Sequence, residues 1–327
     1  MKRIAGYLAI LALSLTIGAG DVAAAPSFEN SKCWFPVTSD APARCGYLLV
    51  PEERGKRTSR TLRLPVVIFE GSESAGGPKA EPILILNGGP GGKFYFANKN
   101  SRAFWTQMAK TLQVPASRDV ILFSQRGTDN ARAKLSECPV FNDPTIFLGA
   151  SKVPGGETDM KVNFLKAFKE CRAMLVKSGY PFHAYSTMAS VADIGDLRST
   201  LGLSKLAVYG VSYGAKLAVE LARHQPRGLT RLVLDSPLPA EGNRMFHQVE
   251  NLVGAMRQLS VICKEIRTCL AGADMEKDLA FLLKKLGNRP REIRLNTNIF
   301  QRDSQIYYVM LDPTILLDAL FQSFYFQ

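Results

Sequence analysis

Histidine is scarce in this sequence, with three residues among 327. No C-x-x-C pair occurs, and we therefore expect no metal site and no cofactor. Basic residues outnumber acidic ones by 41 to 29 but form no run of five or six, so nucleic acid is not an expected partner. With 46% hydrophobic and 21% charged residues, the composition is that of a soluble globular protein. It excludes a disordered chain, collagen and a polytopic membrane protein.

The first 25 residues have the pattern of a secretory signal peptide. Lys2 and Arg3 precede the uncharged apolar stretch 4–20, and small residues at the −3 and −1 positions allow cleavage after Ala24 or Ala25. An uncleaved membrane anchor is the alternative, but the stretch is short for a span of about 20 residues. We expect a secreted or periplasmic protein with no stable membrane insertion after cleavage.

All six cysteines follow this segment, and an even number in an exported protein indicates disulfide bonds. Sequence proximity favours the pairs Cys33 with Cys45, Cys138 with Cys171, and Cys263 with Cys269. Other connectivities, and free thiols at some of these positions, stay open at this point.

After Cys45 the apolar pattern alternates between the periods of strands and helices. We expect strands at residues 45–50, 61–70, 82–86, 119–123, 206–209 and 231–234. We expect helices at residues 101–112, 159–178, 188–201 and 213–224, and then a helical C-terminal part with helices at 246–263, 275–286 and 313–325. Strands that alternate with helices predict the α/β class, with a mostly parallel sheet covered by helices on both faces.

The sequence G-V-S-Y-G at 210–214 carries the strongest chemical signal. It matches G-x-S-x-G between a predicted strand and a predicted helix, which is the context of a nucleophile elbow. Gly210 and Gly214 let the strand reverse tightly into the helix, and Ser212 is then exposed at the helix N-terminus, where free N–H groups favour developing negative charge. We therefore predict Ser212 as a catalytic nucleophile. An accidental glycine-rich turn is the alternative.

A glycine-rich loop, N-G-G-P-G-G at 87–92, follows an earlier predicted strand. The oxyanion of a tetrahedral intermediate needs two N–H donors, one from the residue after the nucleophile and one from a loop of this kind. Tyr213 and either Gly88 or Gly89 fit these roles. A phosphate-binding loop is the alternative, but the Lys-Ser/Thr of a P-loop and the G-x-G-x-x-G spacing are both missing.

Several ordered motifs together resemble one branch of the α/β-hydrolase fold. They are C-G-Y-L-L-V-P-E at 45–52, G-G-P-G at 88–91, S-Q-R-G-T at 124–128, A-D-I-G-D-L-R-S-T-L-G at 192–202, the elbow at 206–214 and R-L-V-L-D at 231–235. Over residues 33–240 the chain is similar to secreted prolyl iminopeptidases and tripeptidyl aminopeptidases. The resemblance implies a serine hydrolase core at residues 26–238 and a helical cap at residues 239–327 that shapes the substrate pocket.

Two positions depart from the pattern of this branch. Asn87 replaces the usual His before G-G-P-G, and Ser124 replaces the usual Asp before Q-R-G. Neither position belongs to the catalytic triad of the family, so the departures concern substrate preference more than chemistry.

The sequence offers no strong catalytic acid or base. In this fold they follow the nucleophile on loops after the seventh and eighth strands, whereas six strands are predicted here. His183 precedes the nucleophile, and His224 lies roughly 18 Å from Ser212 at about 1.5 Å per residue of helix. Asp235 and His247 satisfy the chain order Ser, Asp, His. However, His247 falls in a helical segment without a supporting strand, so this pair is a weak alternative.

We therefore expect an exported serine hydrolase that removes residues from peptide N-termini through an acyl-enzyme on Ser212, with a small peptide or ester as substrate. The apolar sequence L-L-D-A-L-F-Q-S-F-Y-F-Q at 316–327 is unlike a natural terminus. We expect a C-terminally truncated form of a longer protein, inactive as such. The alternatives are a secreted carboxylesterase of the same fold and a non-catalytic relative or pseudogene product that keeps the elbow as scaffold.

Overall fold

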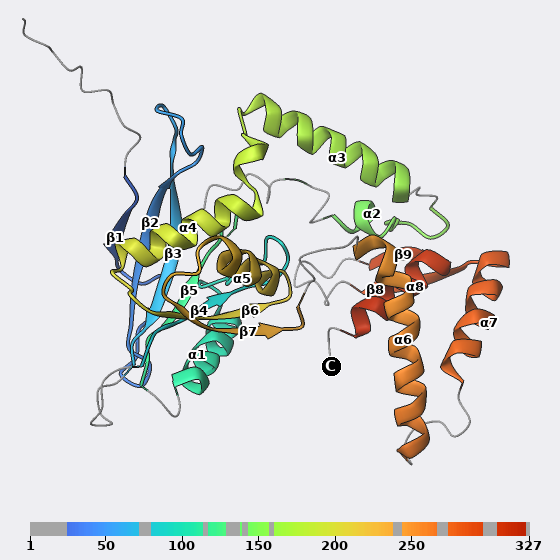
Figure 1. Ribbon diagram of the computed structural model, residues 1–327. Coiled ribbons are helices and arrows are strands. Elements are labelled where there is room, and N and C mark those ends of the chain that lie inside the picture. The colour runs from blue at the N-terminus through green and yellow to red at the C-terminus, as the bar shows by residue number, and fades with distance from the viewer. Residues whose placement is uncertain are drawn as a thin grey trace, which may run out of the picture.

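The computed structural model describes residues 25–71, 80–113, 117–128, 138, 143–156, 160–237, 244–266, 274–296 and 306–324 (Figure 1). Within these ranges the chain forms a central mixed sheet with helices on both faces, and a second group of helices around a two-stranded hairpin. Residues 1–24 of the predicted signal peptide lie outside the described residues, so the signal peptide stays a prediction.

The central sheet has the strand order β1-β2-β3-β5-β4-β6-β7. The bounds are β1 Ser27–Ser31, β2 Ala43–Pro51, β3 Thr61–Phe69, β4 Ile83–Leu86, β5 Val120–Phe123, β6 Leu206–Val211 and β7 Leu229–Asp235. Neighbours from β1 to β5 pair antiparallel, whereas β5, β4, β6 and β7 are parallel to one another. All six predicted strands are confirmed. The pattern did not predict β1, because its sequence S-F-E-N-S lacks apolar alternation.

Helices cover both faces of this sheet. α4 (Thr187–Thr200) and α5 (Tyr213–His224) pack on one face, and α1 (Lys99–Gln113) packs on the other (Figure 1). Each face therefore has its own apolar core. β4 and β5 are buried at every position, which explains why their sequences, I-L-I-L and V-I-L-F, are continuous apolar runs. The predicted α/β arrangement is confirmed.

β7 forms one edge of the sheet. It pairs with β6, and its residues 230–234 are exposed on both faces of the strand. Leu232, Val233 and Leu234 are 36%, 45% and 40% exposed. An apolar edge strand of this kind is a site where another chain can pair and aggregate.

The segment before α4 and the C-terminal part form the second group, which we call the hairpin unit (Figure 1). Its members are α2 Pro144–Phe147, α3 Met160–Lys177, α6 Arg244–Glu265, α7 Met275–Asn288, β8 Arg291–Asn296, β9 Ile306–Leu311 and α8 Pro313–Ser323. The predicted helices of this part are confirmed, and the structure adds an antiparallel hairpin of β8 and β9 that the prediction did not include. The sequence of β8, R-E-I-R-L-N, alternates charged and apolar residues with the period of a strand, and the helical prediction missed that signal.

Ser151 joins this hairpin from a distant part of the sequence. The N–H of Ser151 donates to the Tyr308 carbonyl oxygen and the N–H of Tyr308 donates to the Ser151 carbonyl oxygen, both at 2.8 Å. Nearby, the N–H of Gly155 donates to Glu292 Oε1 at 2.7 Å. Segments that precede and follow the nucleophile in the sequence therefore belong to one structural unit.

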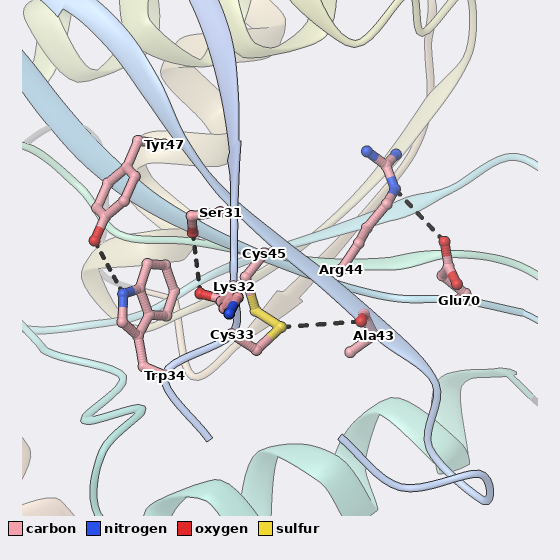
Figure 2. Close-up of a disulfide and its surroundings, with 9 residues drawn as sticks. All are labelled: Ser31, Lys32, Cys33, Trp34, Ala43, Arg44, Cys45, Tyr47 and Glu70. Atoms are coloured by element: carbon pink, nitrogen blue, oxygen red, sulfur yellow. Dashed lines mark hydrogen bonds and ion pairs between the residues drawn. A yellow bond between two sulfur atoms is a disulfide. The ribbon is translucent and has the colours of Figure 1, made fainter. Parts of the chain in front are cut away.

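Two of the three predicted disulfides are confirmed. Cys33 and Cys45, whose Cα atoms are 5.0 Å apart, join the segment after β1 to β2 (Figure 2). Cys138 is bonded to Cys171 on the buried face of α3, with a Cα separation of 5.4 Å. The third predicted pair includes Cys269, which lies outside the described residues, so its pairing with Cys263 stays a prediction.

Candidate active site

Ser212 lies in the tight turn between β6 and α5. Its φ of 55° falls in the left-handed region, which costs an ordinary residue about 1–3 kcal/mol. The flanking glycines make the turn possible. A Cβ on Gly210 would collide with the carbonyl oxygen of Gly214, and a Cβ on Gly214 would collide with the carbonyl oxygen of Leu86. Ser212 is the N-cap of α5 but makes no capping hydrogen bond with its side chain, so the helix does not consume its hydroxyl.

The glycine-rich loop after β4 lies against Ser212. Gly88 is buried, and a Cβ on it would lie 3.1 Å from Ser212 Cβ and 3.6 Å from Ser212 Oγ. The Gly88 N–H donates to Asn87 Oδ1 at 2.8 Å, so this predicted oxyanion donor is already bonded. Gly89 is exposed and has a φ of 115°. Of the two glycines predicted for the loop side of an oxyanion hole, Gly89 is therefore the accessible one.

Side-chain hydrogen bonds of Asn87 and Gln125 stabilise the glycine-rich loop. Asn87 Nδ2 donates to the Lys93 carbonyl oxygen at 3.1 Å, and Gln125 Nε2 donates to the Asn87 carbonyl oxygen at 2.9 Å. Gln125 is only 4% exposed, so little water competes for its hydrogen bond. The sequence marked Asn87 only as a departure from a family pattern, and it gave Gln125 no role. The signal that could have found them is a polar side chain directly after, or one residue beyond, a buried apolar strand.

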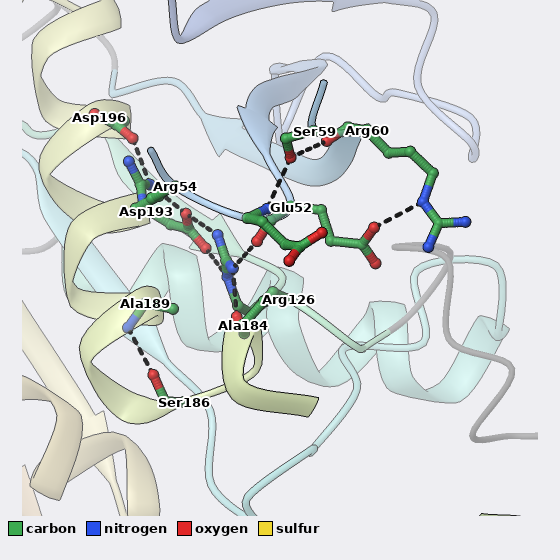
Figure 3. A network of polar contacts seen from close by, with 11 residues as sticks. Glu52, Arg54, Ser59, Arg60, Arg126, Ala184, Ser186, Ala189, Asp193 and Asp196 are labelled. Atoms are coloured by element: carbon green, nitrogen blue, oxygen red, sulfur yellow. Dashed lines mark hydrogen bonds and ion pairs between the residues drawn. The ribbon is translucent and has the colours of Figure 1, made fainter. Parts of the chain in front are cut away.

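A buried ion pair anchors the loop that carries Gln125. Arg126 binds Asp193 of α4 through two hydrogen bonds, Nε to Oδ2 at 2.7 Å and Nη2 to Oδ1 at 2.6 Å (Figure 3). Arg54, from the turn between β2 and β3, also donates to Asp193 Oδ1 at 2.6 Å. Burial raises the pKa of Asp193, and the two guanidinium groups oppose this shift. The network ties the S-Q-R-G-T loop both to α4 and to the β2–β3 turn.

Asp235 ends β7 beside the elbow. Its carbonyl oxygen accepts the N–H of Ser212 at 2.8 Å, whereas its carboxylate is engaged elsewhere. Asp235 Oδ2 accepts the Tyr209 hydroxyl at 2.6 Å, and Oδ1 accepts the Ser236 hydroxyl at 2.9 Å. These hydrogen bonds, that of Tyr209 first, lower the pKa of Asp235. The same contact raises the pKa of Tyr209 to about 12. The predicted alternative acid is thus near the nucleophile but already bonded by two hydroxyls.

The described histidine side chains do not reach Ser212. His183 lies in the short helix η3 (Phe182–Ala184), is 74% exposed and sits 3.3 Å from a surface glutamate. His224 ends α5 and sits 3.5 Å from another glutamate one turn earlier. His247 belongs to α6, but its side chain is outside the described part of the structure, so its pairing with Asp235 in a triad stays a prediction.

Two of the hollows on the described surface are of ligand size and are lined entirely by described residues. The larger, about 560 Å³, lies within the hairpin unit between residues 148–161 and the strand β9 with α8, and its lining includes neither Ser212 nor the glycine-rich loop. The smaller, about 370 Å³, lies beside that loop, between Trp34 and residues 93–98. Among the described residues no group of three or more His, Cys, Asp or Glu side chains is placed to hold a metal ion. No helix in the described ranges is long and apolar enough to cross a membrane.

Comparison with known proteins gives consistent relatives. The family model described as alpha/beta hydrolase fold matches residues 81–261. A tripeptidyl aminopeptidase of Streptomyces lividans is 29% identical over 213 residues, which cover 63% of this chain and 37% of that protein. Serine protease Hip1 of Mycobacterium tuberculosis is 25% identical over 275 residues, which cover 78% of this chain and 49% of that protein. The chain thus spans less than half the length of these relatives. The solved structure of a proline iminopeptidase from Mycobacterium smegmatis is 17% identical, with a TM-score of 0.35 and coverage of 72% of this chain and 66% of that one.

Proposed function

The chain belongs to the α/β-hydrolase fold family, and from that membership we propose that it is an exported serine hydrolase of the peptidase type, with Ser212 as its nucleophile. It is distantly homologous to tripeptidyl aminopeptidases, proline iminopeptidases and the Hip1 serine protease. The observation that carries the proposal is the strained elbow, in which Ser212 is held at positive φ directly against a glycine-rich loop. The relatives support small peptides as substrates and cleavage near the peptide N-terminus.

The proposed reaction proceeds through an acyl-enzyme. Ser212 Oγ attacks the carbonyl carbon of the scissile bond while its proton passes to a histidine base. The carbonyl oxygen becomes an oxyanion that accepts the N–H groups of Gly89 and Tyr213. The histidine then protonates the leaving amine as the carbon–nitrogen bond breaks. Water, deprotonated by the same histidine, releases the acyl group and restores the Ser212 hydroxyl. The N–H of Gly88 is bonded to Asn87 Oδ1, so Gly88 is not assigned as an oxyanion donor. Its role is to pack closely against Ser212.

The histidine base is either His247 or a histidine outside these 327 residues, because His183 and His224 are both paired with glutamates away from the nucleophile. We favour a histidine and an acid that both lie outside these 327 residues, since the Tyr209 and Ser236 hydroxyls already bond the carboxylate of Asp235. On this proposal the 327-residue chain by itself is inactive. Export is supported by the two disulfides of the described structure, which persist in oxidising compartments.

Labelling with a fluorophosphonate, followed by mass spectrometry, tests the nucleophile. We expect the native protein, isolated from the producing cells, to carry the label on the peptide that contains Ser212. The variant Ser212→Ala should not be labelled, whereas Ser204→Ala, at an exposed serine before β6, should be labelled like the wild type. A label on another serine would refute Ser212 as the nucleophile, and no label on the native protein would show it to be a non-catalytic member of the family.

Two further comparisons resolve the open alternatives. If the 327-residue chain is labelled and His247→Ala abolishes the label, His247 is the base. If the native protein is labelled but the 327-residue chain is not, the base lies outside these 327 residues.

Turnover of tripeptidyl and aminoacyl naphthylamides would support the peptidase assignment, whereas turnover of short acyl esters alone would make the protein a carboxylesterase.

A further inference from the structure

The smaller hollow, which we call the Tyr95 pocket, lies near the carboxyl end of β5 in the central sheet. Its walls include Trp34, Pro65, Lys93, Tyr95, Phe96 and Asn98, around a volume of about 370 Å³. The Pro65 carbonyl oxygen accepts the N–H of Ser124, the residue that follows the carboxyl end of β5. In open α/β sheets ligands bind outside the carboxyl ends of the strands, and this pocket lies there.

The pocket is also tied to the glycine-rich loop. Asn87 Nδ2 donates to the carbonyl oxygen of Lys93, and Asn87 Oδ1 accepts the N–H of Gly88, which packs against Ser212. One side chain therefore connects the wall of the Tyr95 pocket to the segment beside the nucleophile.

The aromatic walls are held in place by the fold. Trp34 Nε1 donates to the Tyr47 hydroxyl at 2.9 Å, next to the disulfide of Cys33 (Figure 2). The Trp34 ring stacks on Phe96 with centroids 5.7 Å apart and planes at 19°. Phe96 stacks in turn on buried Phe94 at 5.4 Å. Because these rings are already ordered, a ligand does not have to order them on binding.

Tyr95 is exposed to solvent, and its backbone has a strained, positive φ. Its φ is 51°, and its side chain is 57% exposed, whereas Phe94 and Phe96 on either side are 1% and 7% exposed. The neighbouring backbone is fixed, since Trp105 Nε1 donates to the Phe94 carbonyl oxygen and the Asn98 N–H donates to that of Tyr95. Residues held in a strained backbone conformation cluster at active sites and ligand clamps.

We propose that the Tyr95 pocket binds an aromatic side chain of a peptide together with the free carboxylate of the same residue. The ring packs against Trp34 and Tyr95 by stacked or edge contacts, and Lys93, the one cationic residue of the lining, pairs with the carboxylate. The inference rests on the proposed peptidase function, because it assigns a subsite for the carboxyl-terminal side of a short peptide next to the glycine-rich loop.

Isothermal titration of the full chain with N-acetyl-L-phenylalanine tests the pocket directly. We expect saturable one-site binding. N-acetyl-L-phenylalaninamide should bind about twofold to fivefold more weakly, because it lacks the charge that pairs with Lys93. N-acetyl-L-alanine should bind at least about tenfold more weakly, because it lacks the ring.

Three variants separate binding from folding. Tyr95→Gly removes the ring at a position whose positive φ suits glycine, so we expect no loss of melting temperature but at least about tenfold weaker binding. Lys93→Gln should abolish the preference for the acid over the amide. Phe281→Ala removes a similarly exposed aromatic side chain from α7, outside the pocket, and should leave binding unchanged.

The possible outcomes distinguish a failure of the pocket proposal from a failure of the hydrolase proposal. Equal binding of the alanine probe, unaltered binding by Tyr95→Gly, or tighter binding of N-acetyl-L-proline than of the phenylalanine probe would overturn the aromatic subsite, even if Ser212 is labelled by fluorophosphonate. If the phenylalanine probe binds as expected but the native protein takes no label on Ser212, the hydrolase proposal fails while the pocket assignment holds.

Discussion

Replacement of Asp193 by asparagine should destabilise the fold strongly. Asp193 is the buried acceptor of two arginines, and the side chains of Asp193 and Arg126 are 0% and 1% exposed. Removing the charge from one partner of such a pair leaves the other charge buried without compensation, which costs about 3–5 kcal/mol. At roughly 2–4 °C per kcal/mol for a chain of this size, the melting temperature should fall by about 6–20 °C.

A pair of the same geometry on the surface provides the matched control. Arg257 of α6 binds Glu276 of α7 with two hydrogen bonds, both at 2.9 Å, but the two side chains are 64% and 51% exposed. Water and salt screen such a pair, so Glu276→Gln should leave the melting temperature nearly unchanged. The two substitutions change the same chemical group and differ mainly in burial.

Urea unfolding followed by far-ultraviolet circular dichroism, together with thermal melting, measures both variants against the wild type. We expect a large fall in the urea midpoint for Asp193→Asn and little change for Glu276→Gln. Equal shifts in the two variants would refute the reasoning, because burial would then not decide the strength of the pair. A small effect of Asp193→Asn alone would mean that Asp193 is already uncharged in the folded protein.

Three other substitutions test the loop, the edge strand and the pH response. Asn87→Ala removes the hydrogen bonds of the Asn87 side chain to the Gly88 N–H and to the Lys93 carbonyl oxygen. We expect about tenfold slower fluorophosphonate labelling of the native protein, with little change in melting temperature. An unchanged labelling rate would exclude a positioning role for Asn87. Val233→Lys puts a charge on the exposed edge of β7, so light scattering should report less aggregation at equal protein concentration; unchanged scattering would point to another surface. Tyr209→Phe removes the main hydrogen bond that lowers the pKa of Asp235. A carboxylate with a lowered folded pKa stabilises the protein above its unfolded pKa of about 3.9, and this stability is lost as pH falls through the folded value. The wild type should therefore lose more stability than the variant below about pH 4, and identical pH curves would contradict the assigned contact.

The strands of the sheet differed in how far the sequence could predict them. β4 and β5 are short apolar runs followed by polar or glycine-rich turns, and burial on both faces produces that pattern. β1 has no such pattern, because a polar edge strand is set by its pairing with β2 and by the following disulfide. The hairpin of β8 and β9 carried a period-two signal in β8, but the apolar helical patterns on either side of the hairpin obscured it.

The candidate site was predictable where local backbone geometry dictates the residue type. Gly210 and Gly214 are required because any Cβ would collide with nearby carbonyl oxygens, and this requirement produces the motif around Ser212. The contacts that support the site were not predictable. Arg126 and Asp193 are 67 residues apart in sequence, and only the packing of α4 against the sheet brings them together.

The pairing of Ser151 with Tyr308 has a consequence for the order in which the protein is assembled. Almost half of the chain separates these residues, and the strands that build the elbow all lie before β9 in the sequence. During synthesis the central sheet can close around Ser212 while the segment between α2 and α3, which includes Ser151, still lacks its strand partner. Contacts between such distant segments form slowly, because a long loop must close first. We therefore expect the turn that holds the nucleophile to mature early, and the hairpin unit to be the last part to become ordered.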